Sequence, residues 1–333
     1  MSTLSNAPAP EPRDPRADAL AATIHADEEA PGRWPARGSV PLTVLVPAKS
    51  EASNIVECLR RLRWAEQVAV VDSGSKDDTV ALTQAMGCEV YWFDFPNHSP
   101  DGWPKKRNWA LETLPLRHEW VLFMDADEHM TPELAAEIAD VLAGRRKPAR
   151  GGSGDGWWIN RKLIFMGRWI EHCGYYPSWN LRLFKHALGR FERMTTQGDT
   201  GSGDMEVHEH VTLATGPAGY LENDFLHYAY ADIASWVEKH NRYSSWEAHV
   251  AREGHADGLG ASPFGNGIER KRWIKQMSRQ VPARPTLRFM YHYVLRGGFR
   301  DGYPGWVLCR LLGMYEFLSV AKEQELRTRA EDR

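Results

Sequence analysis

Three carboxylates follow a single apolar run in the stretch WVLFMDADEHM, residues 120–130. Asp125, Asp127 and Glu128 stand at the end of a predicted buried strand, just before a helix start. Carboxylate oxygens are hard ligands, and two aspartates that flank one small residue can share Mg²⁺ or Mn²⁺. Because Mg²⁺ commonly takes one or two carboxylates together with substrate phosphates, the stretch predicts a site for a metal-bound diphosphate. Helix capping alone explains Asp125 poorly, since Thr131 already occupies the expected N-cap position.

Two further acidic residues follow neighbouring predicted strands. Glu51 comes shortly after the run LTVLVPA, residues 42–48, and Asp72 comes directly after QVAVV, residues 67–71. In an open parallel sheet, ligands bind beyond the carboxyl ends of the strands. The acids after these three strands therefore predict one shared site at that edge, although helix capping is an alternative for Asp72.

Strand and helix signals alternate in the segment that carries these acids. Short apolar runs predict strands at residues 42–48, 67–71, 88–95 and 120–126. Helical spacing follows each of them, at residues 54–63, 76–87, 105–114 and 131–144. Such alternation predicts an α/β fold with a doubly wound, mostly parallel sheet flanked by helices. The pattern after residue 233 is helical and predicts a helical C-terminal extension.

The composition argues against several classes of protein. The formal net charge of −3 is not that of a general nucleic-acid binder, which would carry a basic excess. The four cysteines form no CxxC pair, so we expect reduced thiols in a cytosolic protein rather than a zinc site or disulfides. No run reaches the ~18 apolar residues needed to span a bilayer, so any membrane contact is expected to be peripheral.

Four motifs in order resemble glycosyltransferase family 2 enzymes of the GT-A fold. They are VLVPAKSEASNI, VAVVDSGSKDDTV, GWPKKRNWAL and VLFMDADEHM, and together they cover roughly residues 42–142. The later pieces NLRLFK, VHEHV and FLHYAY are similar to the bacterial branch with lipopolysaccharide-core β-1,4-glucosyltransferases and exopolysaccharide transferases. The first motif has Ser50 where the family usually carries Asn.

The resemblance implies roles for the strand-end residues. Pro47, Glu51 and Asp72 would hold the nucleotide, with UDP as the family's usual one. Asp125 would face the ribose or phosphates and could share the metal, whereas Asp127 would ligate Mn²⁺ or Mg²⁺. His227, in FLHYAY, is a candidate third metal ligand by analogy with GT-A enzymes, and a core histidine is the alternative.

Basic residues precede the third predicted helix. Lys105 and Arg107 are expected to contact the sugar or the diphosphate, because cations and free backbone N–H groups at a helix start suit anions. Lys106 fits a solvated basic turn equally well. On the acceptor side we expect Asn180, Arg182 and His208.

The general base is expected in GDMEVHEHVTL, residues 203–213. If this segment is a strand, Glu209 lies on one face between Val207 and Val211. Partial desolvation there would raise the pKa of the Glu209 carboxyl and suit a base that deprotonates an acceptor hydroxyl. A surface strand with exposed polar residues is the alternative.

Composition, the sequence pattern and the resemblance together predict a division of the chain. We expect a disordered tail at residues 1–38, a GT-A catalytic domain at 39–230 and a helical region at 231–333. Within the domain, a nucleotide half at 39–143 would precede an acceptor half at 157–230. The basic and aromatic composition of the helical region fits either packing or contact with an anionic membrane at the cytoplasmic face.

Together these observations predict an inverting, divalent-metal-dependent glycosyltransferase that uses a nucleotide-sugar donor. The acceptor would be a saccharide or a lipid-linked saccharide in lipopolysaccharide or exopolysaccharide biosynthesis. A catalytically inactive sugar-binding homologue is an alternative from another class. A sugar nucleotidyltransferase is a weaker one, because the glycine-rich loop expected after its first strand is replaced here by PAKSEASN.

Overall fold

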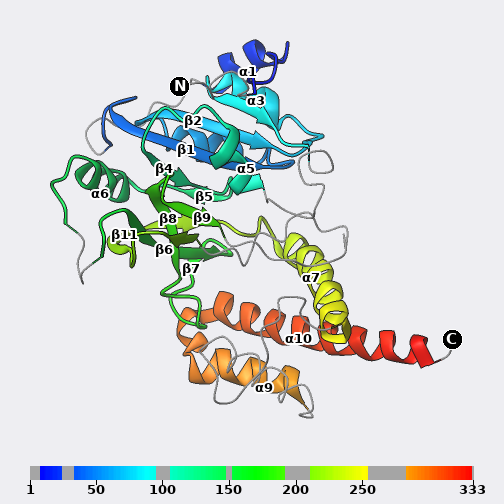
Figure 1. Cartoon of the computed structure of the whole chain (residues 1–333). Coiled ribbons are helices and arrows are strands. Elements are labelled where there is room, and N and C mark those ends of the chain that lie inside the picture. The colour runs from blue at the N-terminus through cyan, green and yellow to red at the C-terminus, as the bar shows by residue number, and fades with distance from the viewer. Residues whose placement is uncertain are drawn as a thin grey trace. The chain divides into compact units, whose positions relative to one another are not determined.

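Four parallel strands form the first half of the main sheet in this computed structural model, which describes residues 8–24, 34–94, 106–147, 152–191, 211–253 and 283–331. In spatial order they are β3 (Glu89–Trp92), β2 (Ala65–Asp72), β1 (Val40–Ala48) and β4 (Trp120–Phe123) (Figure 1). The register pairs Ala48 with Asp72 at the carboxyl ends of β1 and β2. The predicted parallel strands and the shared edge after them are therefore confirmed.

The helices between these strands also agree with the sequence pattern. They are α2 (Ile55–Arg60), α3 (Thr79–Ala85), α5 (Lys106–Thr113) and α6 (Pro132–Leu142). The Thr131 hydroxyl caps α6 by accepting the N–H of Leu134 at 3.3 Å, and Pro132 is the first helical residue. Gly144, with φ of +70°, follows the helix end in the left-handed conformation that glycine adopts without strain.

The second half of the sheet is antiparallel, so the sheet as a whole is mixed. After β4 it continues with β8 (Trp179–Lys185), β6 (Gly156–Phe165), β11 (Gly219–His227) and β5 (Glu128–His129). The β4–β8, β6–β8 and β11–β5 pairs are all antiparallel. A separate small sheet pairs β9 (Gly189–Phe191) with β10 (Val211–Leu213). The predicted α/β class holds, with β1, β2, β3 and β4 joined by parallel pairs.

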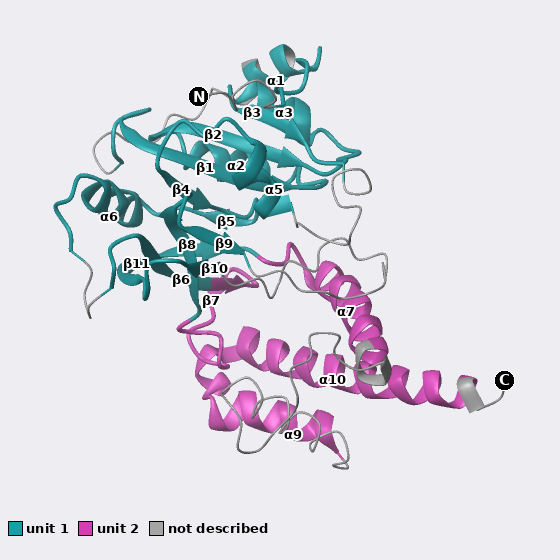
Figure 2. Cartoon of the chain, viewed as in Figure 1, with its two compact units in different colours: residues 1–162, 178–193, 208–228 teal, residues 163–177, 194–207, 229–333 magenta. Residues whose placement is uncertain are grey.

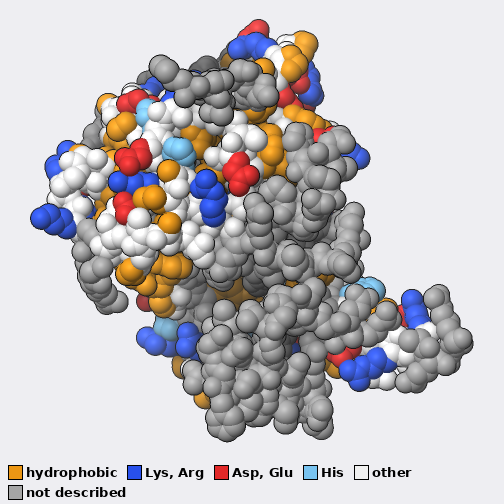
Figure 3. All heavy atoms as spheres, viewed as in Figure 1, with side chains coloured by type: hydrophobic (Ala, Val, Ile, Leu, Met, Phe, Trp, Pro, Cys, Tyr) orange, Lys and Arg blue, Asp and Glu red, His pale blue; other side chains and the backbone are white. Residues whose placement is uncertain are grey.

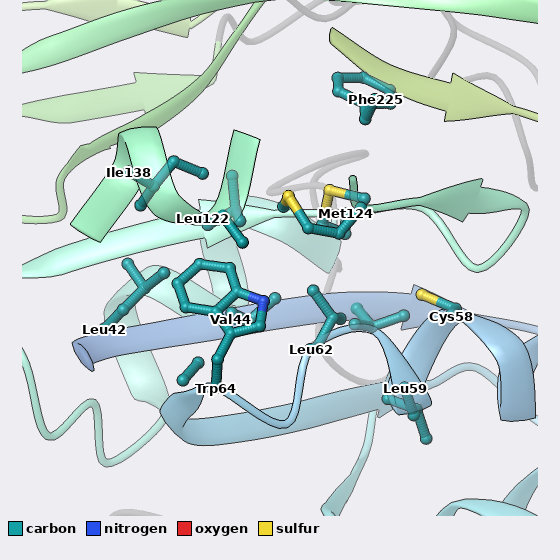
Figure 4. Packing of buried hydrophobic residues seen from close by; sticks show 14 of the residues in the cluster. Leu42, Val44, Cys58, Leu59, Leu62, Trp64, Leu122, Met124, Ile138 and Phe225 are labelled. Atoms are coloured by element: carbon teal, nitrogen blue, oxygen red, sulfur yellow. The ribbon is translucent and has the colours of Figure 1, made fainter. Parts of the chain in front are cut away.

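Both faces of the parallel strands are buried. Leu42, Val44 and Val46 of β1 point into one cluster, which also contains Trp64 and Leu122 (Figure 4). Leu45 lies in a second cluster with Phe123, Phe184 and Phe191 on the other face. Strands buried on both faces read as continuous apolar runs, which explains why no alternation is visible in LTVLVPA.

Part of the segment expected to be a disordered tail is structured. Residues 17–24 form α1 (Ala17–Ile24), which packs against α3 and buries Ala17. The N–H of Glu11 donates to the carbonyl of Val90 in β3 at 2.7 Å. Proline-rich sequence therefore did not preclude docking here, because the edge of β3 supplies hydrogen-bond partners for the chain.

The chain forms two compact units (Figure 2). Unit 1 comprises residues 1–162, 178–193 and 208–228, and unit 2 comprises residues 163–177, 194–207 and 229–333. This division differs from the expected domain at 39–230, because Leu163, Phe165, Ile170 and Cys173 pack with Trp236, Leu308 and Leu312 in the core of unit 2. On the face of unit 1 seen in Figure 3, acidic, basic and apolar side chains are interspersed, as the small net charge suggests.

Unit 2 is mainly helical, as the C-terminal pattern predicted. It contains α7 (Ile233–Glu253), α9 (Arg284–Met290), the π-helical turn η4 (Tyr291–Leu295), the short helix η5 (Gly298–Asp301) and α10 (Gly302–Glu331). Both α7 and α9 pack on α10. The short strand β7 (Arg168–Trp169) pairs with the end of β6 in the same unit. Among the described helices, none combines the length and the apolar character needed to cross a membrane.

Candidate active site

Asp72 closes β2 and is held by its own turn. Its Oδ2 accepts the N–H groups of Gly74 at 2.8 Å and Ser75 at 2.9 Å, and its Oδ1 accepts the Ser75 hydroxyl. Gly74 has a φ of +88°, and a Cβ at this position would approach the Trp92 ring to 3.2 Å. The turn thus fixes a buried carboxylate at the carboxyl edge of the sheet.

The loop after β1 is tied to the loop after β2. The N–H of Ser50 donates to Ser75 Oγ at 2.8 Å, and the N–H of Glu51 donates to Thr79 Oγ1 at 2.8 Å. Glu51 also accepts the Asn54 side-chain amide at 2.8 Å. Two of the predicted nucleotide contacts, Glu51 and Asp72, therefore follow adjacent strands whose loops hydrogen-bond to each other. Pro47, paired with Val71, is half-buried near the end of β1.

Asp125, just past β4, forms ion pairs with two arginines from separate segments. Arg107 Nη2 lies 2.7 Å from Asp125 Oδ1, and Arg182 Nη2 lies 2.7 Å from Asp125 Oδ2. Arg107 comes from the start of α5 and Arg182 from β8, whose register with β4 pairs Leu122 with Leu183. The predicted anion-facing Arg107 and the predicted acceptor-side Arg182 therefore meet on one carboxylate.

Glu128 completes this acid–arginine cluster. Its Oε1 lies 3.1 Å from Arg182 Nη2, and its Oε2 accepts the N–H of Asp125 at 2.8 Å. The Glu128 side chain is fully buried, and Arg182 is 6% exposed. A buried carboxylate with two such donors is a structural anchor for the backbone at Asp125.

The charges in the cluster shift the pKa values of the two carboxyls in opposite directions. Burial raises the pKa of Asp125, but Arg182 and Arg107 outweigh it and hold that pKa well below the ordinary value of 3.8. Burial raises the pKa of Glu128 above 4.5, with Arg182 opposing the shift and Asp125 adding to it. The Arg182 pKa is raised because the attraction of Asp125 and Glu128 exceeds the cost of its burial.

Asp127 lies beside His227, one of its predicted co-ligands. The pairing of β5 with β11 sets His227 opposite Glu128, and the N–H of Tyr228 donates to the Asp127 carbonyl at 2.8 Å. His227 Nε2 is then 3.5 Å from Asp127 Oδ2. These two side chains, 100 positions apart in the sequence, approach because a two-residue strand follows the aspartates.

The start of α5 is anchored from two sides. Asn108 exchanges two hydrogen bonds with the backbone of Phe191, donating at 2.8 Å and accepting at 2.9 Å. The Arg107 guanidinium lies 5.4 Å from the centroid of the Phe191 ring. Lys106 is buried, and its Nζ donates to the carbonyl of Ala48 at 3.4 Å. The alternative of a solvated turn for Lys106 is therefore wrong.

Three of the predicted site residues lie outside the described residues: Lys105, His208 and Glu209. The first stays a predicted donor contact, the second a predicted acceptor contact and Glu209 the predicted base. Asn180, predicted on the acceptor side, is half-buried on β8, and its amide donates to the carbonyl of Ser178 at 3.0 Å.

The sequence reading did not assign Glu128 or Lys106 to the site. The structure brings Glu128 onto Arg182 and Lys106 to the end of β1. For Glu128 a signal was present, because a third acid five residues after the end of the buried strand β4, in an apolar context, is unusual without a charge partner. For Lys106 the pattern of KKRNW, with its lysine pair, carried no indication of burial.

A divalent cation fits this edge only together with substrate oxygens. Within the described part of the chain, no group of three or more His, Cys, Asp or Glu side chains is arranged to hold a metal by itself. Asp127 and His227 offer one oxygen and one nitrogen, whereas both oxygens of Asp125 accept guanidinium contacts. Mg²⁺ or Mn²⁺ bound through few protein ligands and several phosphate oxygens agrees with that donor set.

Comparison with known proteins identifies the segment that carries this cluster. Residues 43–203 match the description Glycosyl transferase family 2. A lipopolysaccharide core biosynthesis glycosyltransferase, LpsC, of Rhizobium meliloti is 23% identical over 288 residues, covering 85% of this chain and 92% of the relative. An uncharacterized glycosyltransferase of Rickettsia felis is 25% identical over 295 residues, covering 85% of this chain and 89% of the relative.

Among solved structures, glucosyl-3-phosphoglycerate synthase from Mycobacterium tuberculosis, in complex with Mn²⁺, UDP and glucosyl-3-phosphoglycerate, is similar at a TM-score of 0.37 and 15% identity. The match covers 74% of this chain and 86% of that one.

Proposed function

We propose that this glycosyltransferase, whose residues 43–203 match family 2, moves a sugar from a nucleotide-sugar to a saccharide or lipid-linked acceptor. The observation that carries this proposal is the set of charged side chains at the carboxyl ends of β1, β2 and β4. Asp72, Asp125, Asp127, Arg107 and Lys106 all lie at that edge, where ligands of parallel sheets bind.

In this proposal the loops after β1 and β2 receive the nucleotide. Glu51 and the turn of Asp72 face the base and ribose, and the carbonyl end of β1 at Pro47 forms the floor. Arg107 stays on Asp125 and adds positive charge beside the diphosphate, and Lys105 adds a second cation there. UDP is the expected nucleotide, from the sequence resemblance.

Asp127 and His227 would hold Mn²⁺ or Mg²⁺ on the two phosphates, and Asp125 would complete the site from the ribose side. When bound, the cation neutralises charge on the leaving diphosphate. The residues of the chain set where this can happen: Arg182 and Glu128 fix the backbone at Asp125, and the β5–β11 pairing fixes the distance from Asp127 to His227.

We further propose an inverting transfer with Glu209 as the base. Its carboxylate takes the proton of the acceptor hydroxyl while the acceptor oxygen forms a bond to the anomeric carbon. The bond from that carbon to the phosphate oxygen breaks on the opposite side, and the nucleoside diphosphate leaves. Asn180 and His208 would contact the acceptor. A donor with an α-linked sugar would give a β-linked product.

The relative's role in lipopolysaccharide core biosynthesis supports an acceptor of that kind, and an exopolysaccharide intermediate fits the same chemistry. In this proposal the protein acts at the cytoplasmic face of the membrane, as the sequence resemblance implies.

The test is release of nucleoside diphosphate from a panel of nucleotide-sugars with Mn²⁺, with Mg²⁺ and with a chelator. We expect one donor to be consumed in a metal-dependent reaction. Glu209→Gln should retain donor binding and lose transfer by about 10²-fold or more. Transfer by Glu209→Gln at the wild-type rate would rule Glu209 out as the base.

A catalytically inactive homologue predicts a different result from the same panel. It would bind a nucleotide-sugar and release no diphosphate with any acceptor fraction tested. Tight binding without turnover by the unaltered chain would therefore favour a sugar-binding or scaffolding role over the enzyme proposed here.

A further inference from the structure

The helix that α9 and η4 form together, residues 284–295, has an apolar outer face. Leu287, Met290, Tyr291, Val294 and Leu295 are each between 45% and 77% exposed. Their spacing of three and four residues puts them on one stripe of the helix. Surface helices normally turn such a stripe inward, so this helix presents to solvent the face that is usually buried.

The opposite face of the same helix is already packed in unit 2. Phe289 and Tyr293 lie against the apolar core of the unit. Arg284 and Arg288 approach the buried Glu316 of α10 at 2.5 Å and 2.6 Å. These contacts fix the rotation of the helix about its axis, so the apolar stripe cannot turn inward without breaking both ion pairs.

The exposed apolar surface continues through η5 into the start of α10. Phe299, Tyr303 and Trp306 are 55%, 67% and 41% exposed, and the rings of Tyr303 and Trp306 stack with centroids 5.7 Å apart. Because η5 contacts both η4 and α10, these three residues belong to the same group of packed helical segments as the stripe. We call the eight residues together the apolar docking face: Leu287, Met290, Tyr291, Val294, Leu295, Phe299, Tyr303 and Trp306.

The segment that carries this face also carries exposed positive charge. Arg296, Arg300 and Arg310 are exposed. Between residues 283 and 310, all of which the structure describes, the one acidic side chain is Asp301, which is buried and paired with His172 at 2.9 Å. A protein partner would have to be both apolar and acidic to match, whereas a bilayer with anionic headgroups offers both properties in one surface.

We propose that the apolar docking face binds the surface of an anionic phospholipid bilayer. The aliphatic side chains enter the boundary between headgroups and acyl chains, and the Tyr and Trp rings occupy the headgroup level. The three arginines pair with lipid phosphates. The contact is peripheral, and it is independent of the donor site, although it would bring the proposed function to a lipid-linked acceptor.

The experiment is sedimentation of the full-length protein with vesicles of phosphatidylglycerol and phosphatidylcholine, and with phosphatidylcholine alone. The unaltered protein should bind the anionic vesicles, and Leu295→Ser combined with Tyr303→Ser should weaken that binding about tenfold or more. Ile233→Ser is the control, because Ile233 is also an exposed apolar residue of the same unit, 42% exposed on α7. It should bind as the unaltered protein does.

A second set of variants tests the charge. Arg296→Gln, Arg300→Gln and Arg310→Gln should each weaken binding to anionic vesicles about fivefold, and added salt should have the same direction of effect. Binding to phosphatidylcholine alone should not change. An equal loss of binding to both vesicle types would show that these arginines do not interact with the charge of the lipid.

Three results would overturn the proposal. The first is failure of the unaltered protein to bind anionic vesicles, and the second is undiminished binding by the Leu295→Ser, Tyr303→Ser variant. The third is an oligomer, measured by light scattering without lipid, that this variant dissociates, because the face would then be covered by a second copy. Nucleotide-sugar binding by the same variants should stay unchanged, which separates this result from a failure of the donor site.

Discussion

Asp72 and Asp125 both stand where a parallel strand of the same sheet ends, yet they are held in different ways. Asp72 accepts the N–H groups of its own turn, within three residues of the sequence. Asp125 accepts two guanidinium groups, one from α5 and one from β8. The Asp72 carboxylate is held by its local turn, independently of the rest of the fold. The position of the Asp125 carboxylate depends instead on the packing of β4, α5 and β8.

We expect the largest loss of stability from a substitution at Arg182, which contacts Asp125 but not Asp72. Replacing it in Arg182→Leu leaves Glu128 buried without a cation and Asp125 with only one. Removing one member of a buried ion pair costs about 3–5 kcal/mol of unfolding free energy. Chemical denaturation should show this loss, and Arg190→Leu, at an exposed arginine of β9, should cost less than about 0.5 kcal/mol. A loss below 1 kcal/mol for Arg182→Leu would contradict the role of the cluster as an anchor.

The same substitution at the two aspartates should have unequal effects. In Asp125→Asn, one end of the new amide must point its N–H groups at a guanidinium, and we expect a loss of about 2–3 kcal/mol. In Asp72→Asn, the amide oxygen can keep both backbone N–H groups while the NH₂ donates to Ser75 Oγ, and we expect about 1 kcal/mol. Equal losses, measured by denaturation of both variants, would show that the two carboxylates are not held differently.

Lowering the pH should change the contributions of Asp125 and Glu128 to stability in opposite directions. Because the pKa of Asp125 in the folded chain lies well below 3.8, its charge stabilises the fold at pH above that value, and the contribution is lost as the pH falls through the folded pKa. Glu128, with a raised pKa, has the opposite sign: it costs stability at neutral pH and the cost is relieved by acid.

The wild type should therefore lose more stability than Asp125→Asn between about pH 5 and pH 3, in unfolding free energies measured across that range. Parallel curves for the two proteins would show that Asp125 is not the group that supplies this acid dependence.

The smallest effect concerns the loop that ties the two strand ends together. Ser50 has a φ of +56°, a left-handed conformation that asparagine tolerates better than serine. Ser50→Asn should therefore stabilise the chain by about 0.5 kcal/mol, and Ser50→Val should destabilise it by more than 1 kcal/mol, in thermal unfolding. Destabilisation by Asn would mean that the hydroxyl contact to the N–H of Lys76 outweighs the backbone preference.

The contrast between Asp72 and Asp125 also separates the features that the sequence predicts from those that it does not. Strand ends, the Thr131 cap and the shared edge depend on neighbouring residues, and periodicity and turn chemistry predicted them. The contacts of Arg182 with Asp125, 57 positions away, depend on β8 running antiparallel beside β4, a pairing that no local pattern encodes. Only the resemblance suggested that His227 lies beside Asp127. The strand β5, which brings them together, has two residues, too few to show a hydrophobic periodicity.

The tail and the second unit illustrate the same limit. Composition predicted disorder for residues 1–38, but α1 docks on α3 through contacts that composition does not contain. Residues 163–177 read as part of the first domain because they continue its strands in sequence. Their apolar side chains complete the core around Trp236 instead.

The most direct test of the central claim is thermal stabilisation by nucleotide-sugars, with and without Mn²⁺, on wild type, Asp127→Ala and the exposed control Asp140→Ala. A ligand at 100 times its Kd adds about 2.7 kcal/mol to the folded state. The account predicts a Mn²⁺-dependent rise in Tm of several degrees with one nucleotide-sugar, retained in Asp140→Ala and absent in Asp127→Ala. An equal rise in Asp127→Ala, or no rise with any donor in the folded wild type, would contradict it.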